Sequence, residues 1–236
     1  MKIACWSGPR NISTALMRSW SSRKDTFVSD EPFYSYYLKK QGLKHPMYKE
    51  IIESYPHEYD DIIKYLLSEI PQGKKYWYQK HMAHHMDGIE DFSWIKNFKN
   101  YFLIRHPKYV ISSFIKKNTL NSVKQLGYPQ QLKIIEYLRK NNLEFYVISS
   151  EDILDNPQNR LANWCSQLNI PFHNDMLSWE KGPHENDGIW GKHWYDSVYQ
   201  TSGFFLNKQL DENISLDEHE CIYKEAYSYY KKIYTI

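Results

Sequence analysis

The sequence has few cysteines, and none of them is arranged as a pair. Cys5, Cys165 and Cys221 stand far apart without a CxxC spacing, so we expect free thiols in a reducing cytoplasm rather than a disulfide framework. Long hydrophobic runs are also missing. No segment has about 18 consecutive apolar residues or the apolar region of a signal peptide, so we predict a cytoplasmic protein that is neither exported nor membrane-spanning.

Charge of one sign is not in excess either. The 30 basic and 28 acidic residues leave a formal net charge of +2, whereas domains that coat DNA or RNA usually carry a strong basic excess. We therefore expect no nucleic-acid partner. There is no internal repeat and no linker rich in proline and glycine. With 42% apolar residues the chain can bury a sizeable core, and we predict a single domain over residues 1–236.

Hydrophobic segments that suit strands alternate with segments of helical periodicity. Strands are predicted near residues 2–6, 26–33, 74–80, 100–107 and 143–152, and helices near 11–23, 34–70, 107–117, 128–140 and 157–168. A capping box from Ser215 to Glu218 predicts a last helix that runs toward Tyr234. The alternation predicts an α/β fold: a single three-layer domain with a mainly parallel sheet flanked by helices. Ligands are then expected at the carboxyl ends of the strands.

The first predicted strand leads through a tight turn into the first predicted helix, as in phosphate-binding loops. A helix N-terminus offers unpaired N–H groups and a partial positive charge to an anion. Ile12 and Ser13 stand where the ATP-type loop has its glycine and lysine, which disfavours a triphosphate with a metal and favours a shorter anion. An ordinary capped strand–turn–helix explains the loop equally well. The candidate ligands of the anion are Gly8, Pro9, Arg10, Asn11, Ile12, Ser13 and Thr14.

A second strand-to-helix junction, YFLIRHPKYVISSF, has the same character. Arg105 stands at the carboxyl end of the strand, and the helix that begins at Pro107 turns Ser113 back toward it. An arginine and a hydroxyl that converge in this way form an anion clamp. Taken alone, a capped helix with a surface arginine is the simpler interpretation. Two anion sites at the carboxyl edge of one sheet, however, indicate a ligand with two separated anionic groups.

The motifs SGPRNIST and RHPKYVISS resemble the 5′- and 3′-phosphate-binding elements of the sulfotransferases that use 3′-phosphoadenosine-5′-phosphosulfate (PAPS). Arg10, Ser13 and Thr14 match the first, fourth and fifth places of the family's first motif. Arg105 and Ser113 match the two fixed places of its second motif. The resemblance implies a P-loop-like phosphosulfate-binding loop, PAPS as the sulfuryl donor, 3′,5′-phosphoadenosine (PAP) as the product, and no required metal.

The resemblance continues through residues 149–172, which are similar to the segment that follows the last core strand of the family. Three positions depart from the family's pattern. Ile12 replaces a glycine, Ser150 stands where many members have a tyrosine that touches the adenine, and Ala15 stands where cytosolic members have a stacking tryptophan. Ser150 is still a candidate ligand of the donor, but the resemblance leaves the adenine-binding residues open.

The late glycine-rich loop of the family is partly matched by residues 181–203. Gly188 and Trp190 keep the family's Gly-x-Trp step, and Lys192 or His193 would supply charge to the 3′-phosphate. By this resemblance Gly188, Trp190 and Lys192 are candidate ligands of the donor. A tryptophan-rich packing loop is an equal alternative.

Sulfuryl transfer to an alcohol needs a base near the acceptor hydroxyl and positive charge around the transferred group. We expect Lys80 to stabilise the bridging oxygen. Glu31 follows the second predicted strand, and several bacterial and glycan sulfotransferases resemble this in placing a catalytic glutamate there. His81 lies one residue out of register with the histidine base of cytosolic members, so we favour Glu31 over His81. His81 and His85 have the spacing of metal ligands but no third ligand nearby, so we expect no metal site.

These interpretations lead to one preferred function and two alternatives. We expect transfer of a sulfuryl group from PAPS to a hydroxyl or amine of a small acceptor, with residues 33–70 forming either an acceptor lid or an amphipathic layer on the sheet. The alternatives are a small-molecule P-loop kinase, which would need Mg²⁺ and ATP, and a non-catalytic nucleotide-binding module of the same fold. The expected partner is the small acceptor, without nucleic acid or membrane, and the expected state is a monomer or homodimer.

Overall fold

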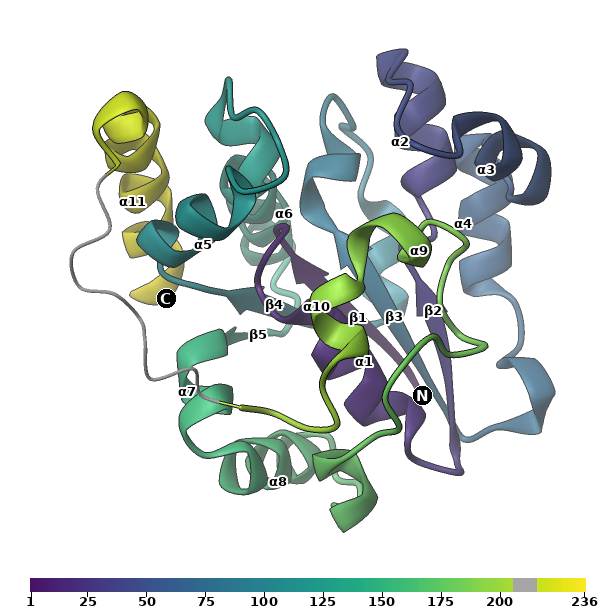
Figure 1. The fold of residues 1–236 in the computed structure, drawn as a ribbon. Coiled ribbons are helices and arrows are strands. Elements are labelled where there is room, and N and C mark those ends of the chain that lie inside the picture. Colours follow the sequence, from purple (N-terminus) through teal and green to yellow (C-terminus); the bar gives the residue numbers. More distant parts are fainter. Residues whose placement is uncertain (206–215) are drawn as a thin grey trace.

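A computed structural model describes residues 1–205 and 216–236. Its centre is a five-stranded sheet in which all strands are parallel, in the order β2-β3-β1-β4-β5 (Figure 1). The strands are β1 (Lys2–Ser7), β2 (Thr26–Asp30), β3 (Tyr76–Met82), β4 (Lys99–Ile104) and β5 (Phe145–Ser149). The predicted α/β fold with a parallel sheet flanked by helices is confirmed.

The described helices follow the strands and include several short ones. They are α1 (Ser13–Ser21), α2 (Tyr34–Gln41), α3 (Tyr48–Ser54), α4 (Tyr59–Leu67), α5 (Pro107–Phe114), α6 (Tyr128–Lys140), α7 (Ser150–Asp155), α8 (Pro157–Gln167), α9 (Gly191–Trp194), α10 (Asp196–Tyr199) and α11 (Glu220–Tyr234). The predicted helical segment 34–70 is divided because Gly42 caps α2 in the left-handed region and Pro56 separates α3 from α4.

Several predicted boundaries differ from the structure: the strands expected at 26–33 and 100–107 end at Asp30 and Ile104, and the helix expected at 107–117 ends at Phe114. The strand expected to continue to residue 152 ends at Ser149, because the hydroxyl of Ser149 accepts a hydrogen bond from the backbone N–H of Asp152 and so caps α7. The last helix begins at Glu220, and Ser215, the first residue of the expected capping box, lies outside the described residues.

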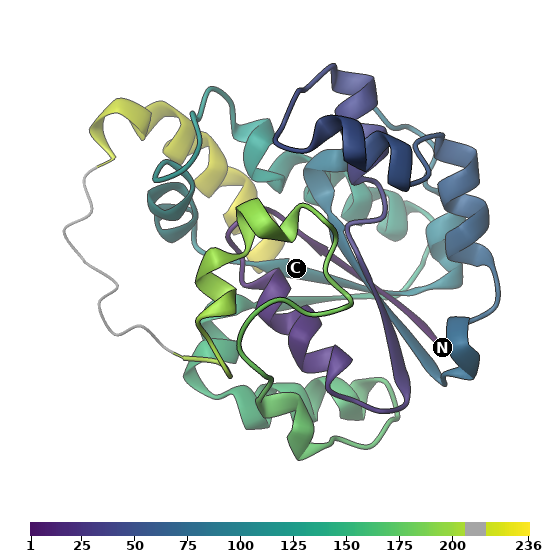
Figure 2. The ribbon, with the colours of Figure 1, turned by 45° about the vertical axis from the view of Figure 1, so that its right-hand side comes forward.

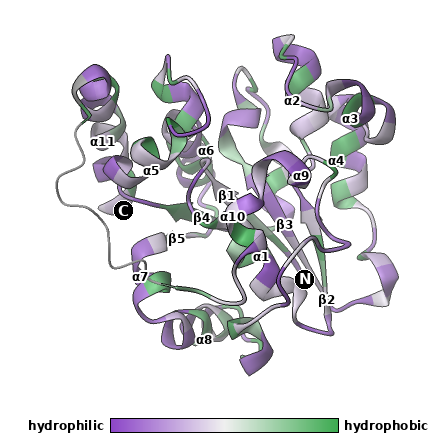
Figure 3. Ribbon diagram, in the orientation of Figure 1, coloured by the Kyte–Doolittle hydropathy of each residue, from purple (hydrophilic) through white to green (hydrophobic). Residues whose placement is uncertain are grey.

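A hydrophobic core lies on each face of the sheet, and the side chains of successive β1 residues point alternately into one core and the other. Ile3 and Cys5 point into the core that includes α1 and α8, whereas Ala4 and Trp6 point into the core that includes α4, α6 and α11. In Figure 3 the helices that flank the sheet carry both hydrophobic and hydrophilic residues, as amphipathic covering helices must. Burial of each large side chain stabilises the fold by roughly 1.5–3 kcal/mol.

Because the strands are parallel, their carboxyl ends and the loops that follow them meet at one edge of the sheet. The loop 181–203, which contains α9 and α10, crosses this edge in front of α1 (Figures 1 and 2). A buried ion pair of 2.6 Å between Arg18 of α1 and Asp187 fastens the loop there. The fold thus brings residues from both halves of the chain to the edge where ligand binding is expected.

No helix in the described parts of the chain is long and apolar enough to cross a membrane. The thiols of Cys5, Cys165 and Cys221 are free, with the first two buried and the third exposed.

Candidate active site

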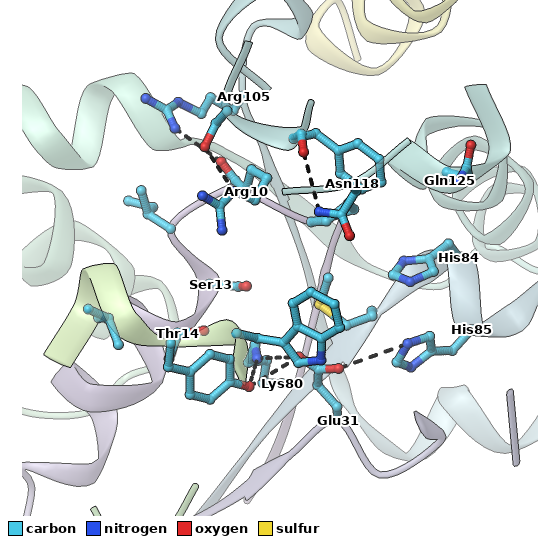
Figure 4. Close-up of a pocket in the computed structure, with 18 of the residues that line it drawn as sticks. Arg10, Ser13, Thr14, Glu31, Lys80, His84, His85, Arg105, Asn118 and Gln125 are labelled. Atoms are coloured by element: carbon cyan, nitrogen blue, oxygen red, sulfur yellow. Dashed lines mark hydrogen bonds and ion pairs between the residues drawn. The ribbon is translucent and has the colours of Figure 1, made fainter. Parts of the chain in front are cut away.

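A cavity of about 770 Å³ opens at the carboxyl edge of the sheet. Loops after β1, β3 and β4 contribute to it, together with α2, α5 and the loop 181–203. In Figure 4, Arg10 and Arg105 lie at one end of this cavity and Glu31 and Lys80 lie at the other. Its charged lining residues are Arg10, Glu31, Lys80, Asp87, Arg105 and Lys124.

The loop between β1 and α1 presents polar groups to the cavity. Arg10 and Ile12 have left-handed backbone conformations, with φ of 64° and 57°, which are unfavourable for an arginine and still more so for a β-branched isoleucine. Ser13 and Thr14 stand in the first turn of α1 and line the cavity. No described residue forms a hydrogen bond with either hydroxyl, so the N-terminus of α1 and both hydroxyls can serve an anion.

Three of the predicted ligands hold this loop in place and do not line the cavity. A Cβ atom on Gly8 would lie 2.0 Å from the carbonyl oxygen of Leu126, so only glycine fits there. Asn11 is buried and donates to the carbonyl of Pro9 at 3.1 Å. Ser150, buried at the start of α7, donates to the carbonyl of Asn11 at 3.0 Å. The predicted loop residues that do line the cavity are Pro9, Arg10, Ile12, Ser13 and Thr14.

Arg10, Arg105 and Ser113 form what we call the arginine end of the cavity. Nε of Arg10 donates to Oγ of Ser113 at 2.8 Å, and Arg105 donates to the carbonyl oxygen of Arg10 at 3.0 Å. Nε of Arg105 is buried without a hydrogen-bond partner, and neither guanidinium forms an ion pair with a carboxylate of the described residues. The two predicted anion clamps are therefore one continuous cationic surface.

The charges of the arginine end are incompletely compensated. Burial lowers the pKa of both arginines, and the neighbouring charge of Arg105 lowers that of Arg10 further. Glu151 opposes the shift at Arg105 without forming an ion pair with it. Two like charges held together at a partly buried place are stabilised by an anion, which supplies charge and hydrogen-bond acceptors together.

Asp30, Glu31, Lys80 and Tyr195 form what we call the lysine end. Asp30 and Lys80 are paired residues of the adjacent strands β2 and β3, so their side chains lie on the same face of the sheet. Nζ of Lys80 lies 2.8 Å from Oδ1 of Asp30, 2.6 Å from Oε1 of Glu31 and 2.6 Å from the hydroxyl of Tyr195. Burial alone would lower the pKa of Lys80, but the two carboxylates outweigh burial and raise it.

Glu31 is positioned by its backbone as well as by its ion pair. Its N–H continues the ladder to the carbonyl of Lys80 at 2.9 Å, and its φ of 44° turns the chain away from β2 toward α2. Oε1 contacts Lys80, whereas Oε2 lies 3.9 Å from Nε2 of His85 and accepts no hydrogen bond from a described residue. Burial, helped by the charge of Asp30 and opposed by Lys80, raises the pKa of Glu31.

Comparison with known proteins decides the family. The profile of the sulfotransferase domain matches residues 1–234. The chain belongs to the sulfotransferase domain family. Its sheet and its cavity at the carboxyl ends of β1, β3 and β4 are therefore those of a sulfotransferase domain.

Two curated relatives from Arabidopsis thaliana are branched-chain-amino-acid aminotransferase-like proteins 1 and 2. They are 31% and 29% identical to this sulfotransferase domain over 221 residues, which are 93% of this chain and 39% of each relative. The chain thus spans about two fifths of the length of the curated relatives it matches.

Solved structures with a similar fold include two other sulfotransferase domains. The sulfotransferase domain from the Synechococcus PCC 7002 olefin synthase has a TM-score of 0.58 at 18% identity, covering 97% of this chain and 94% of that one. The sulfotransferase domain from the curacin biosynthetic pathway has a TM-score of 0.50 at 18% identity, covering 79% and 80%. At this identity the likeness concerns the fold.

His81, the alternative base, does not reach the cavity of this sulfotransferase. Successive residues of a strand point to opposite faces, so His81 cannot share a face with Lys80. Its imidazole is 1% exposed, stacks on Trp6 with ring centroids 4.4 Å apart, and has a pKa lowered to about 3 by burial. His81 is a core residue, and the proposal of a base at this position is wrong on geometric grounds. The histidines that line the cavity are His45, His84 and His85.

His84 and His85 are site residues that sequence reasoning missed. Both follow β3 and line the cavity, and burial lowers the pKa of His84 to about 3 and that of His85 well below its ordinary value. Both are therefore neutral at pH 7 and can exchange hydrogen bonds without adding charge. Among the described residues no group of three or more His, Cys, Asp or Glu side chains is arranged to hold a metal.

Some residues of the loop 181–203 pack behind the wall of the cavity, and others form part of that wall. Gly188 donates its N–H to Oδ2 of Asp30 at 3.0 Å, and a Cβ there would strike the ring of Trp190. Trp190 is buried and donates to the hydroxyl of Tyr195 at 3.1 Å. Neither residue lines the cavity, and Lys192 is exposed outside it, so the predicted donor contacts of these three residues are not formed by this geometry. The part of the loop that lines the cavity is Trp194, Tyr195, Ser197, Val198, Thr201 and Gly203.

The helical segment 33–70 divides between the two roles considered for it. Tyr34 and Tyr37 of α2 line the cavity, and the ring of Tyr37 stacks on His85 at 4.7 Å. Ile62 and Leu66 of α4 are buried in the core on the sheet. Hence α2 is a wall of the cavity, while α4 belongs to the amphipathic layer that covers the sheet.

Proposed function

We propose that this sulfotransferase domain transfers the sulfuryl group of PAPS to a hydroxyl or amine of a small acceptor. The observation that carries the proposal is the joining of two different charged sites in one cavity. Arg10 and Arg105 converge there without a carboxylate partner, and Glu31 lies at the other end with one carboxylate oxygen free. The first site suits a ligand with phosphate groups, and the second suits removal of a proton.

The residues of the arginine end fit the two phosphate positions of PAPS. Arg105 has a buried Nε without a partner, which an anionic oxygen would satisfy. We assign Arg105 and Ser113 to the 3′-phosphate, and the N-terminus of α1 with Ser13 and Thr14 to the 5′ group. Arg10 contacts Ser113 and belongs to the same loop as Ser13, so it can serve both groups. When bound, PAPS supplies the activated sulfuryl group and a nucleotide leaving group.

The lysine end supplies acid–base chemistry in this proposal. Oε2 of Glu31 accepts the proton of the acceptor hydroxyl while the sulfur–oxygen bond forms, and the raised pKa of Glu31 makes it a stronger base than an exposed glutamate. All three N–H bonds of Lys80 have acceptors in Asp30, Glu31 and Tyr195. Lys80 therefore acts through its charge, and the free donors for the transferred group come from Arg10, Ser13 and Thr14.

The walls near Glu31 favour a small acceptor with apolar surface. Tyr34, Tyr37 and Trp194 line this part of the cavity together with the neutral imidazoles of His84 and His85. Rings of this kind contact apolar groups and leave few charges to desolvate.

The test is an assay with ³⁵S-labelled PAPS and a panel of alcohols, phenols and amines, run beside the variant Glu31→Gln. Labelled acceptor that forms with the native protein and not with the variant is the expected result. Binding of PAP without turnover of any acceptor would indicate a non-catalytic nucleotide-binding module. Turnover of ATP that needs Mg²⁺ would indicate a kinase and contradict the proposal.

A further inference from the structure

Asp30 accepts more hydrogen bonds than any other group at the lysine end, although the cavity wall does not include it. Oδ1 accepts from Nζ of Lys80 at 2.8 Å, and Oδ2 accepts from the N–H of Gly188 at 3.0 Å. The hydroxyl of Tyr195 lies 2.8 Å and 2.7 Å from the two oxygens. The carboxylate of Asp30 is 2% exposed. It therefore joins β2, β3 and the loop 181–203 at one buried point.

The hydroxyl of Tyr195 can donate its proton only to a carboxylate. It accepts from Nζ of Lys80 at 2.6 Å and from Nε1 of Trp190 at 3.1 Å, which occupies both lone pairs. Its proton must then go to a carboxylate: it lies nearest the oxygens of Asp30, and Oε1 of Glu31, 3.1 Å from the same hydroxyl, shares it. Because the three protons of Lys80 are also all engaged, Lys80 cannot turn away without breaking this set of bonds.

The lysine end holds two carboxyl groups but only one ammonium group. Asp30 and Glu31 share the single ammonium of Lys80, and all three side chains are at most 11% exposed. After burial itself, the charge of Asp30 is a cause of the raised pKa of Glu31, opposed by Lys80 and by the hydrogen bond of Tyr195. His85 is neutral because burial lowers its pKa. The groups that face Glu31 from the packed elements are thus Asp30, Tyr34, Lys80, His85 and Tyr195.

We propose that Asp30 and Tyr195 are positioning residues of this sulfotransferase. They hold Lys80 against Glu31, tie the loop 181–203 to the base of the cavity, and set the pH at which Glu31 can take a proton. The inference rests on the proposed function, in which Glu31 is the base. Asp30 acts through Lys80 and Glu31 and does not contact the acceptor.

The experiment follows the carboxyl carbon of Glu31 by NMR titration of glutamate-labelled protein, with its resonance identified by its loss in Glu31→Gln. Asp30→Asn removes the charge, keeps one acceptor oxygen and replaces the other with an NH2 group, so the titration midpoint of Glu31 should fall by roughly one pH unit or more. Tyr195→Phe removes a donor that favours the carboxylate, so the midpoint should rise. Tyr59→Phe, which loses the hydrogen bond to Asp91 outside the cavity, should leave the midpoint unchanged.

A second measurement tests the link to the loop 181–203. The amide of Gly188 donates to Asp30, so its hydrogen exchange should accelerate by about tenfold or more in Tyr195→Phe and remain slow in Tyr59→Phe. This variant keeps the ring and therefore tests the inference even if Asp30→Asn does not fold. Midpoints that stay in place, or that move in the same direction in both variants, would overturn the inference.

The dependence of kcat on pH separates this inference from the proposed function. If Glu31 is the base, activity is lost as the pH falls through the pKa of Glu31, so the acid limb should move to lower pH in Asp30→Asn together with the NMR midpoint. Midpoints that shift as expected in a protein without turnover of PAPS would retain the positioning role and contradict the sulfuryl transfer. An acid limb that stays in place while the midpoint moves would contradict the role of Glu31.

Discussion

Both ends of the cavity hold cations, buried at the lysine end and half-buried at the arginine end, but only the lysine end supplies their counter-ions. At the lysine end, Lys80 contacts two carboxylates and a hydroxyl of the chain itself. At the arginine end, Arg10 and Arg105 contact a hydroxyl and a backbone carbonyl, and no carboxylate of the described residues pairs with them. The lysine end is complete within the protein, whereas the arginine end is suited to charge that arrives with a ligand.

This difference separates the cation that stabilises the fold from the cations that are available to bind a ligand. A cation with its own carboxylates stabilises the fold only as long as the whole group is present. A cation without them is a cost to folding that binding of an anion offsets. The comparison therefore predicts that removing the cation of the lysine end lowers the stability of the fold, whereas removing a cation of the arginine end lowers the affinity for the ligand.

The largest effect is expected for Lys80→Met. The change leaves Asp30 and Glu31 buried without their counter-ion, and loss of one partner of a buried ion pair costs about 3–5 kcal/mol. Chemical denaturation would measure the free energy of unfolding. Lys99→Met, which removes an exposed pair with Glu144, is the matched control and should change it little. A Lys80→Met protein as stable as the native one would show that the lysine end is not a unit.

Glu31→Gln should abolish most of the activity while leaving the arginine end intact. Loss of a general base costs roughly 10²- to 10⁴-fold in kcat. In the native protein, burial and the charge of Asp30 raise the pKa of Glu31, so the acid limb of kcat should lie above the ordinary range of a glutamate. Steady-state kinetics across pH would measure both effects. The same kcat in Glu31→Gln and native protein would exclude Glu31 as the base.

A smaller effect is expected for Ser113→Ala, which removes the hydroxyl that holds Arg10 at 2.8 Å. In the proposed function the same hydroxyl also binds the 3′-phosphate, and a hydrogen bond to a charged group is worth about 1.5–3 kcal/mol, so the affinity for PAP should fall by roughly tenfold or more. Calorimetric titration with PAP is the measurement. Ser112→Ala changes the neighbouring residue, which does not line the cavity, and should bind PAP like the native protein.

The smallest effect is expected for His81→Phe. Phe keeps an aromatic ring among Trp6, Phe33 and Trp94, but it removes the buried hydrogen bond of His81 to Gln79, which costs about 1–3 kcal/mol of stability. The kcat should stay within about twofold of the native value, because His81 does not line the cavity. A folded variant with a kcat reduced a hundredfold would restore His81 as a candidate base.

The same comparison explains which parts of the site could be predicted from the sequence. Each half of the arginine end is contained in one strand-to-helix junction, so the short spacing from Arg105 to Ser113 and the polar residues from Arg10 to Thr14 were sufficient signals. The parallel sheet then followed from the alternation of strands and helices, and it placed both junctions at one edge.

The lysine end could be predicted only in part. Asp30 stands next to Glu31, but its pairing with Lys80 depends on the register of β2 on β3, which the residue pattern does not specify. Tyr195 meets Asp30 across 165 positions of sequence, and no local signal marks such a contact. The period of two along β3, which turns His81 and Lys80 to opposite faces of the sheet, is visible in the sequence.

The most direct test of the central claim is calorimetric titration of the native protein and Arg105→Ala with PAP and, separately, with ATP and Mg²⁺. The account predicts that PAP binds the native protein more tightly than ATP with Mg²⁺ does. In Arg105→Ala the affinity for PAP should fall by at least about tenfold, since a charge-assisted hydrogen bond contributes roughly 1.5–3 kcal/mol. Equal affinity of both proteins for PAP, or tighter binding of ATP with Mg²⁺, would contradict the claim that the arginine end holds a bisphosphorylated nucleotide.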